Sequence, residues 1–161
     1  SMTDVEVFRH LARTTHQVLR LNTAGITHEE SLLQPAPAGN CLNWVVGHVQ
    51  HVNEQLLLLL GQPAVLGVEA VQRYERGSEP LRDGADAVDF DTLLGAWDEA
   101  ARRMDAGLAA LTPERLAAPA PVTGFGDSTA EMLAFTMFHQ AYHTGQAGVL
   151  RRLLGKERAI P

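Results

Sequence analysis

Between residues 90 and 111, apolar side chains recur at alternating intervals of four and three residues. The positions with this spacing are Phe90, Leu94, Trp97, Ala101, Met104, Leu108 and Leu111. An α-helix turns through about 100° per residue, so this spacing gathers the side chains on one face. An unbroken run of this kind is typical of a helix that packs along its whole length against other helices. The segment therefore favours an all-α fold.

Three other segments show comparable helical spacing, and two of them begin with capping boxes, Thr3 with Glu6 and Ser128 with Glu131. The four long helices are predicted at about residues 3–22, 43–60, 91–111 and 128–154. No segment shows the sustained period-two alternation of a half-buried β-strand. The sequence therefore predicts the all-α class, with a single four-helix-bundle domain over residues 1–161.

The same spacing predicts which face of each helix points into the core. In the first helix the apolar positions are Val7, Leu11, Val18 and Leu21. In the last helix the face is defined by Met132, Phe135, Thr136, Leu150 and Leu154. We expect both sets of side chains to be buried.

Residues 61–88 form a long crossover between the second and third long helices. They are rich in Gly, Pro, Asp and Arg, and only residues 69–74 predict a short helix. A connection of this length is unusual in a compact bundle and often serves as a lid or pocket wall. Its arginines could bind a carboxylate or could be solvated surface residues: Arg73, Arg76 and Arg82.

Charge and cysteine content narrow the possible partners and the compartment. The formal net charge is -6, which argues against nucleic acid, whose phosphates need a basic face, and gives no polybasic signal for membranes. The single cysteine, Cys41, excludes an internal disulfide and favours a reducing, cytoplasmic compartment. The N-terminal residues lack the apolar stretch of a signal peptide, and the leucines at 56–60 are too few to span a bilayer.

Two histidines, His139 and His143, lie four residues apart in the last predicted helix. On a helical wheel they fall near the middle of its apolar face, with Gln146 close by. Side chains four apart on a helix have Cβ atoms about 5–6 Å apart, which allows one metal ion to bind both imidazoles. The alternative is a pair of hydrogen-bonded core histidines, although each buried ring then needs partners for both nitrogens.

The second long helix offers a third imidazole. His48 lies at the edge of the apolar face, so it is the better ligand, whereas His51 lies about 60° further round and could be a pocket acid or base or a solvated residue. Three imidazoles leave at least one coordination position open, which is typical of a catalytic metal site. Zinc is the first expectation for these ligands, and nickel, manganese, iron, cobalt and copper are alternatives.

The segments NWVVGHVQHVNE and HQAYHTGQ, at 43–54 and 139–146, together resemble the DinB-like (DinB/YfiT-like) superfamily. In that family a tryptophan precedes the first ligand histidine by four residues, as Trp44 precedes His48 here. The last helix carries the other two ligands in a form like H-x-x-x-H-R-G-Q. Thr144 replaces the usual arginine, so a charge that is often present beside the site is missing. The resemblance spans nearly the whole chain.

The resemblance implies an up-down-down-up arrangement of helices, a homodimer and a divalent metal on His48, His139 and His143. Relatives include transferases and isomerases that use low-molecular-weight bacterial thiols. The expected function is therefore metal activation of such a thiol, in an S-transferase-type reaction on a small-molecule substrate, or of water.

Other functions and roles stay open at this point. A metal-dependent hydrolase, a non-catalytic metal-binding stress-response module and a metal-free helical interaction protein are the alternatives. The residues that could orient substrate or move protons are Gln146, His51, Glu54 and Tyr74.

Overall fold

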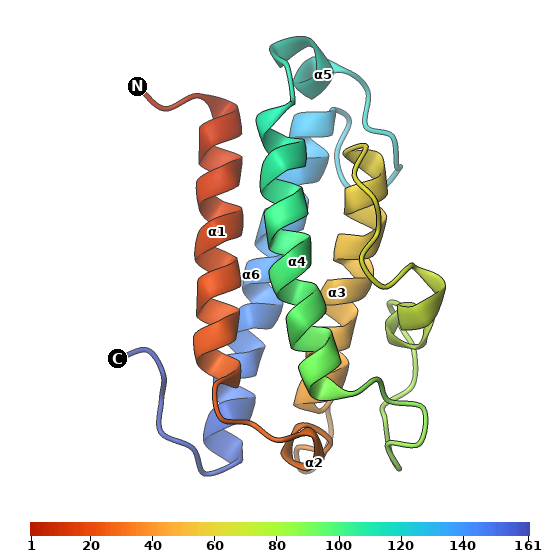
Figure 1. Ribbon diagram of the computed structural model, residues 1–161, viewed down its shortest axis with the longest axis vertical. Coiled ribbons are helices and arrows are strands. Elements are labelled where there is room, and N and C mark those ends of the chain that lie inside the picture. The colour runs from red at the N-terminus through yellow and green to blue at the C-terminus, as the bar shows by residue number, and fades with distance from the viewer.

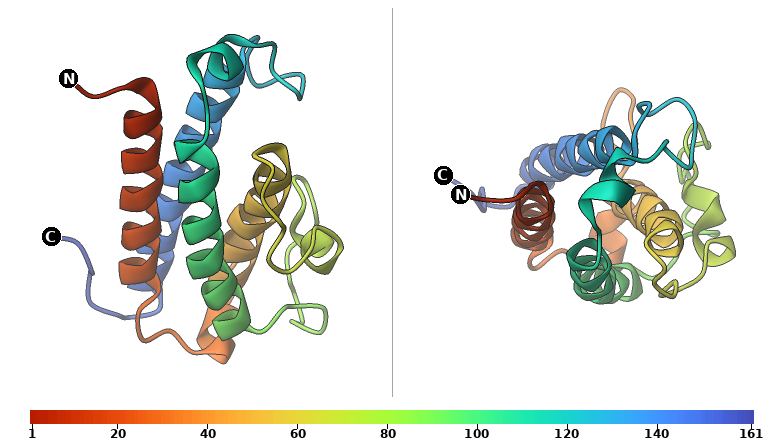
Figure 2. Two further views of the ribbon diagram at one scale, coloured as in Figure 1. Left: turned by 45° about the horizontal axis from the view of Figure 1, so that its top comes forward. Right: turned by 90° about the horizontal axis from the view of Figure 1, so that it is seen from above.

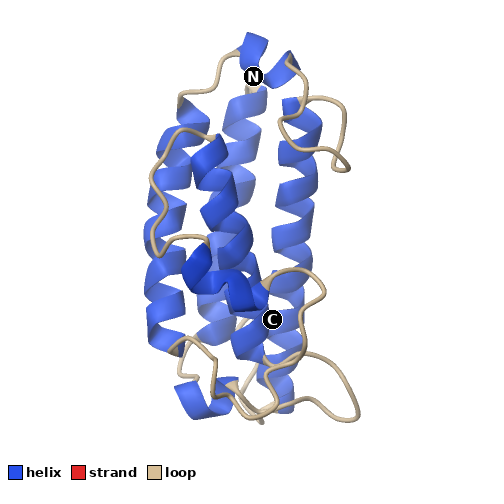
Figure 3. Cartoon of the chain, turned by 90° about the vertical axis from the view of Figure 1, so that its right-hand side faces the viewer, coloured by secondary structure: helices blue, strands red, loops and turns tan.

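The computed structural model describes residues 1–161, and helices are its only regular elements (Figure 3). In chain order they are α1 (Asp4–Thr23), α2 (His28–Ser31), α3 (Leu42–Leu59), the 3-10 helix η1 (Glu69–Tyr74), α4 (Phe90–Ala109), α5 (Pro113–Ala117) and α6 (Thr129–Leu153). The all-α prediction is confirmed, and the four long helices end close to their predicted limits. None of the helices combines the length and apolar character needed to cross a membrane.

The four long helices pack side by side. Helix α1 contacts α4 and α6, and α3 contacts the same two helices from the other side. Figure 1 shows that α3 and α4 run in the same direction, opposite to α1 and α6, because the crossover returns the chain along the outside of α3. This is the up-down-down-up order that the resemblance implies. Seen along the helices, α1 and the crossover lie on opposite sides of the molecule (Figure 2).

Local sequence sets the ends of several helices. Both predicted capping boxes form, at the start of α1 and at the start of α6. The loop predicted after α4 contains the additional short helix α5. It forms because the side chain of Thr112 accepts a hydrogen bond from the N–H of Arg115. Pro113 occupies the first turn, where a backbone N–H would have no partner within the helix.

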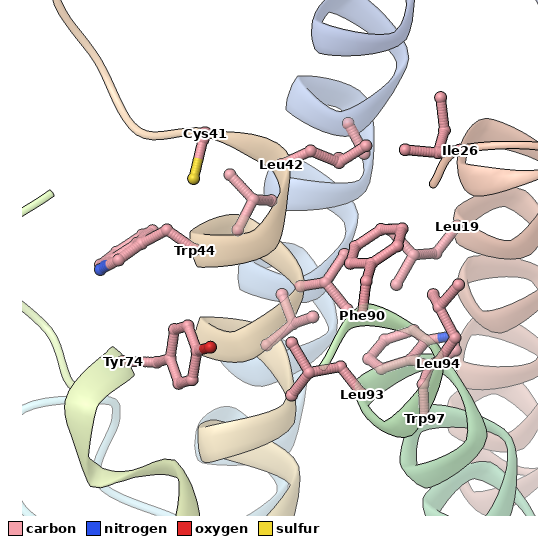
Figure 4. Packing of buried hydrophobic residues seen from close by; sticks show 14 of the residues in the cluster. Leu19, Ile26, Cys41, Leu42, Trp44, Tyr74, Phe90, Leu93, Leu94 and Trp97 are labelled. Atoms are coloured by element: carbon pink, nitrogen blue, oxygen red, sulfur yellow. The ribbon is translucent and has the colours of Figure 1, made fainter. Parts of the chain in front are cut away.

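Two clusters of buried apolar side chains fill the space between the helices. In the larger cluster, Phe90, Leu93 and Trp97 of α4 pack toward Leu19 of α1 and the start of α3 (Figure 4). The second cluster contains Phe8, Leu57, Met104 and Leu133, among others, and so involves all four long helices. Most of the apolar face that was predicted for α4 is buried, while Ala101 and Leu111 are half-buried.

The buried face of α1 differs from the predicted one. Three of the predicted core positions are exposed: Val7, Leu11 and Leu21. The buried positions are Phe8, Leu19, Asn22 and Thr23. Polar contacts with α4 orient the helix: Arg9 Nε lies 3.0 Å from Asp105 Oδ1, and Trp97 Nε1 donates to the carbonyl of His16 at 3.3 Å. Because these partners lie on another helix, apolar spacing within α1 could not predict its orientation.

The crossover is tied to α3 by a buried carboxylate. Glu54 has no exposed surface. Its oxygens accept hydrogen bonds from the backbone N–H groups of Val65 at 2.7 Å and Leu66 at 2.8 Å, and from Gln50 Nε2 at 2.8 Å. These three donors satisfy the buried charge and hold the start of the crossover against the helix.

Candidate metal centre

Three histidine rings from two helices meet near the crossover. His48 comes from the middle of α3, and His139 and His143 come from successive turns of α6. Each ring offers one nitrogen, and these three atoms lie within 4.8 Å of one another. The Nε2 atoms of His48 and His139 are 3.1 Å apart. The fold therefore brings together the three residues that were predicted as metal ligands.

The ring of His48 is fixed by α3 and by the crossover. Trp44, one helical turn earlier, stacks on it with ring centroids 4.8 Å apart and an interplanar angle of 13°. The indole Nε1 of Trp44 in turn donates to Ser78 Oγ at 2.9 Å, and His48 Nδ1 lies 2.8 Å from the carbonyl oxygen of Tyr74. Trp44 and His48, which lie four residues apart, thus stack their rings on each other, and one hydrogen bond from each ring to the crossover holds the stack in place.

Each of the two α6 rings has its Nδ1 atom against a side-chain amide. His139 Nδ1 lies 3.0 Å from Gln140 Oε1, and His143 Nδ1 lies 2.7 Å from Gln146 Oε1. With the amide oxygen facing the ring, as in both pairs here, the neutral ring donates from Nδ1 and keeps its lone pair on Nε2. The same holds for His48, whose Nδ1 faces a backbone carbonyl.

Burial keeps the three imidazoles neutral. Desolvation lowers the pKa of His48 to about 4, against the hydrogen bond to the Tyr74 carbonyl, which raises it. Desolvation is also the main cause that lowers the pKa of His139 and of His143. Neutral imidazole is the form that binds a metal ion. The donor set, with lone pairs of two rings facing each other across 3.1 Å, therefore fits a divalent cation.

The histidines lie at the margin of the buried face of α6, not at its middle. The buried residues of this helix are Thr129, Met132, Leu133, Met137, Gln140, Thr144 and Ala147. His139, His143 and Gln146 are only half-buried, and Phe135, predicted as a core residue, is 40% exposed. Helix α6 packs against α1 as well as α3, which rotates its buried face away from the histidines.

Thr144 belongs to this buried face and is 3% exposed. Its backbone carbonyl accepts a hydrogen bond from Asn22 Nδ2 of α1 at 3.0 Å, and its own hydroxyl has no partner. The residue that replaces the family's arginine is thus enclosed where α6 meets α1.

The other predicted site residues contribute in different ways. Gln146 contacts His143 directly. Tyr74 supplies its backbone carbonyl to His48, while burial raises the pKa of its hydroxyl to about 12. His51 is 6% exposed, desolvation lowers its pKa, and its Nε2 has no hydrogen-bond partner.

The arginines of the crossover also differ from one another. Arg73 pairs with Asp86 and donates to the carbonyls of Glu79 and Pro80, so it serves the crossover itself. Arg76 is exposed, and its positive charge is one cause that lowers the pKa of His139. The charge of Arg76 therefore acts on one of the three rings, whereas Arg73 is held within the crossover.

Gln140 is a site residue that the helical spacing did not single out. It follows His139 directly and lies on the buried face with Met137 and Ala147. A glutamine at a core position needs hydrogen-bond partners for its amide, which is the signal that could have identified it.

Comparisons with known proteins agree with this fold. A family model described as the DinB superfamily matches residues 6–147. Among solved structures, the chain is similar to a conserved protein from Enterococcus faecalis, with a TM-score of 0.75 and 17% sequence identity over 97% of this chain and 100% of that chain. At this identity the likeness shows the fold alone. No curated protein matches the sequence.

Proposed function

The chain belongs to the DinB superfamily, and from this premise we propose that it is a metal-dependent enzyme. In this proposal His48, His139 and His143 hold a divalent ion, with zinc as the first expectation. Such an ion would supply Lewis acidity for a low-molecular-weight thiol that is transferred to an electrophilic small molecule, or for water.

One observation carries the proposal: the 3.1 Å separation between the Nε2 atoms of His48 and His139. Both rings donate from Nδ1 to a carbonyl oxygen, so both Nε2 atoms present lone pairs. Two such lone pairs repel each other unless a cation or a proton lies between them. Since burial lowers the pKa of both rings, a metal ion is the better candidate at neutral pH.

An ion held by three imidazoles would leave at least one coordination position for an exogenous ligand and would lower the pKa of a thiol or water bound there. The protein's own groups orient the ligands. Trp44 and the Tyr74 carbonyl fix the ring of His48, and Gln146 fixes that of His143. His51 remains our candidate for moving a proton, because its Nε2 has no hydrogen-bond partner; this atom is buried, so the role requires that substrate binding opens access to it.

Elemental analysis of protein purified without a nickel column tests the metal site. We expect about one divalent ion per chain in the wild type, because the three ligands form a single centre. His139→Ala should lose the ion and keep its helical circular dichroism. The exposed residue His10 supplies a matched control, and His10→Ala should retain the metal. Unchanged metal content in His139→Ala would refute the assignment.

A reaction screen then separates the possible activities. The metal-loaded protein would be incubated with thiols and electrophiles, and separately with esters and amides, with His139→Ala as the control. Thiol consumption that His139→Ala abolishes would support the transferase. Hydrolysis without thiol would support the hydrolase, and metal binding without either activity would favour a non-catalytic stress-response module.

The expected homodimer is part of the proposal and is independent of the metal chemistry. Sedimentation equilibrium with and without metal would measure the mass of the particle. A monomer at all concentrations would remove the dimer from the proposal and leave the metal site untouched.

A further inference from the structure

The side chain of Gln140 is fixed by hydrogen bonds at both ends of its amide. Its Nε2 lies 3.1 Å from the carbonyl oxygen of Val49 and 2.7 Å from Oδ1 of Asn53, and its Oε1 lies 3.0 Å from Nδ1 of His139. Gln140 is 5% exposed and Asn53 is 3% exposed. With so little access, solvent does not readily replace these contacts.

The carbonyl of Val49 decides which way the amide points. A backbone carbonyl has no proton to donate, so the group of Gln140 that faces it is the NH2. The oxygen of the amide then faces His139. Reversing the amide would set its oxygen against the Val49 carbonyl oxygen in a buried place, where the two oxygens repel each other and the Gln140 oxygen finds no donor.

The orientation of the Gln140 amide determines which ring nitrogen of His139 carries the proton. Because Gln140 Oε1 can only accept, His139 must donate from Nδ1, and its lone pair is on Nε2, the atom that faces His48. We propose that Gln140 is a positioning residue that holds His139 in the Nδ1–H tautomer and so keeps Nε2 free for a metal ion. The inference rests on the proposed metal site, but the tautomer can be measured without metal.

The side chain of Gln140 borders a place between the long helices where the packing is incomplete. Gln140, Asn53, Met137 and Trp97 are among the residues that line a cavity of about 60 Å³ between the long helices. The cavity provides room for the amide to rotate if its hydrogen bonds are lost. The unbranched substitution Gln140→Met can also be accommodated there without overpacking.

Gln146 provides a matched comparison within the same helix. It makes the same type of contact with its histidine, 2.7 Å from His143 Nδ1, but it is half-buried and no second hydrogen bond fixes its amide. Water can reach and replace a half-buried contact of this kind. We therefore expect Gln140→Met to have a much larger effect than Gln146→Met.

Long-range ¹⁵N–¹H correlation spectra of metal-free, histidine-labelled protein at pH 8 report the tautomer directly. His139→Ala would identify the His139 signals. In the wild type we expect His139 to be protonated at Nδ1. In Gln140→Met we expect the Nε2–H form to become populated. Gln140→Glu keeps an acceptor for Nδ1–H and should show the wild-type tautomer, although it loses the NH2 that faces the Val49 carbonyl and should therefore be less stable. Gln146→Met should leave His139 unchanged.

Metal titration supplies the second readout. Gln140→Met should weaken zinc binding by about 10–100-fold, the usual effect of removing a group that orients a ligand histidine. Gln140→Glu should bind within a few-fold of the wild type. A merely structural role would lower the unfolding midpoint of Gln140→Met without changing the tautomer.

Failure of this inference can be distinguished from failure of the metal site. A wild-type His139 that is protonated at Nε2, or a Gln140→Met protein with unchanged tautomer and affinity, overturns the role of Gln140. A wild type with the expected tautomer that binds no divalent ion refutes the metal site and leaves the positioning role standing. If Gln140→Met does not fold, Gln140→Ala removes the same acceptor of the His139 Nδ1–H with a smaller side chain, and an unchanged His139 tautomer in that variant also overturns the inference.

Discussion

The aromatic ring of Tyr74 lies against the backbone of α3 at Gly47, the residue before His48 (Figure 4). A Cβ atom on Gly47 would lie 2.2 Å from Cδ1 of Tyr74. The ring is fully buried, and its hydroxyl donates to Asn43 Oδ1 at 2.7 Å and accepts from the N–H of Val88 at 2.7 Å. This close approach sets the distance between η1 and α3. It thereby brings the Tyr74 carbonyl oxygen within hydrogen-bond distance of His48 Nδ1.

Gly47→Ala should therefore disturb both the fold and the site. We expect it to destabilise the protein by about 1–3 kcal/mol, because the new methyl group must displace a buried ring. Zinc binding should also weaken, since the Tyr74 carbonyl would move away from His48 Nδ1. Urea unfolding and calorimetric titration would measure the two effects.

Gly145→Ala, in α6, is the control for this change. No atom lies within 4 Å of a Cβ at Gly145, and alanine favours a helix over glycine by about 0.5–1 kcal/mol. Gly145→Ala should thus be neutral or stabilising. Equal stability of Gly47→Ala and the wild type would show that the crossover moves outward without cost, contrary to our expectation.

Glu54→Gln tests whether this carboxylate is structural. One amide NH2 would replace an oxygen that now accepts a backbone N–H of Val65 or Leu66, so two donors would face each other. We expect a loss of about 1–3 kcal/mol in the free energy of unfolding. The exposed Glu157 is the control, and Glu157→Gln should change stability little. A Glu54→Gln protein of wild-type stability that has lost activity would favour the catalytic role instead.

Acidification should destabilise the metal-free protein between pH 6.5 and pH 4. The pKa of His48 falls from 6.5 to about 4 on folding, so the unfolded chain binds this proton first and stability is lost as the pH drops through this range. The contribution of this residue is about 3 kcal/mol. The lowered pKa values of His139 and His143 act in the same direction.

Urea unfolding of the wild type and of His48→Asn from pH 7 to pH 4.5 would check the effect. Asparagine can still donate to the Tyr74 carbonyl but does not titrate. The difference in stability between the two proteins should shrink as the pH falls. A constant difference would mean that His48 has an ordinary pKa in the folded state.

Metal should raise the thermal midpoint reversibly. An ion at 100 times its Kd stabilises the folded state by about 2.7 kcal/mol, which for a domain of this size is a shift of about 5–10 °C. A chelator should reverse the shift, and His139→Ala should not show it. His10→Ala should show the same shift as the wild type. If metal changes the thermal midpoint of neither protein, the ion does not bind at this centre.

The positions of the four long helices could be predicted because their signals are local. Capping boxes lie within four residues, and the apolar spacing of α4 is read within one helix. The buried faces of α1 and α6 could not be predicted equally well. The face of α1 depends on Asp105 and Trp97 of α4, and that of α6 depends on how it packs against α1.

The sequence by itself determined the all-α class and the three imidazoles, since helical spacing pairs His139 with His143 and places His48 at the edge of the apolar face of its own helix. Only the tertiary structure decided how the rings are held. The Tyr74 carbonyl lies 26 residues from His48 along the chain, and the Val49 carbonyl that orients Gln140 lies 91 residues away from it. Which nitrogen carries the lone pair depends on these distant acceptors, and contacts between distant segments exist only once the helices have packed.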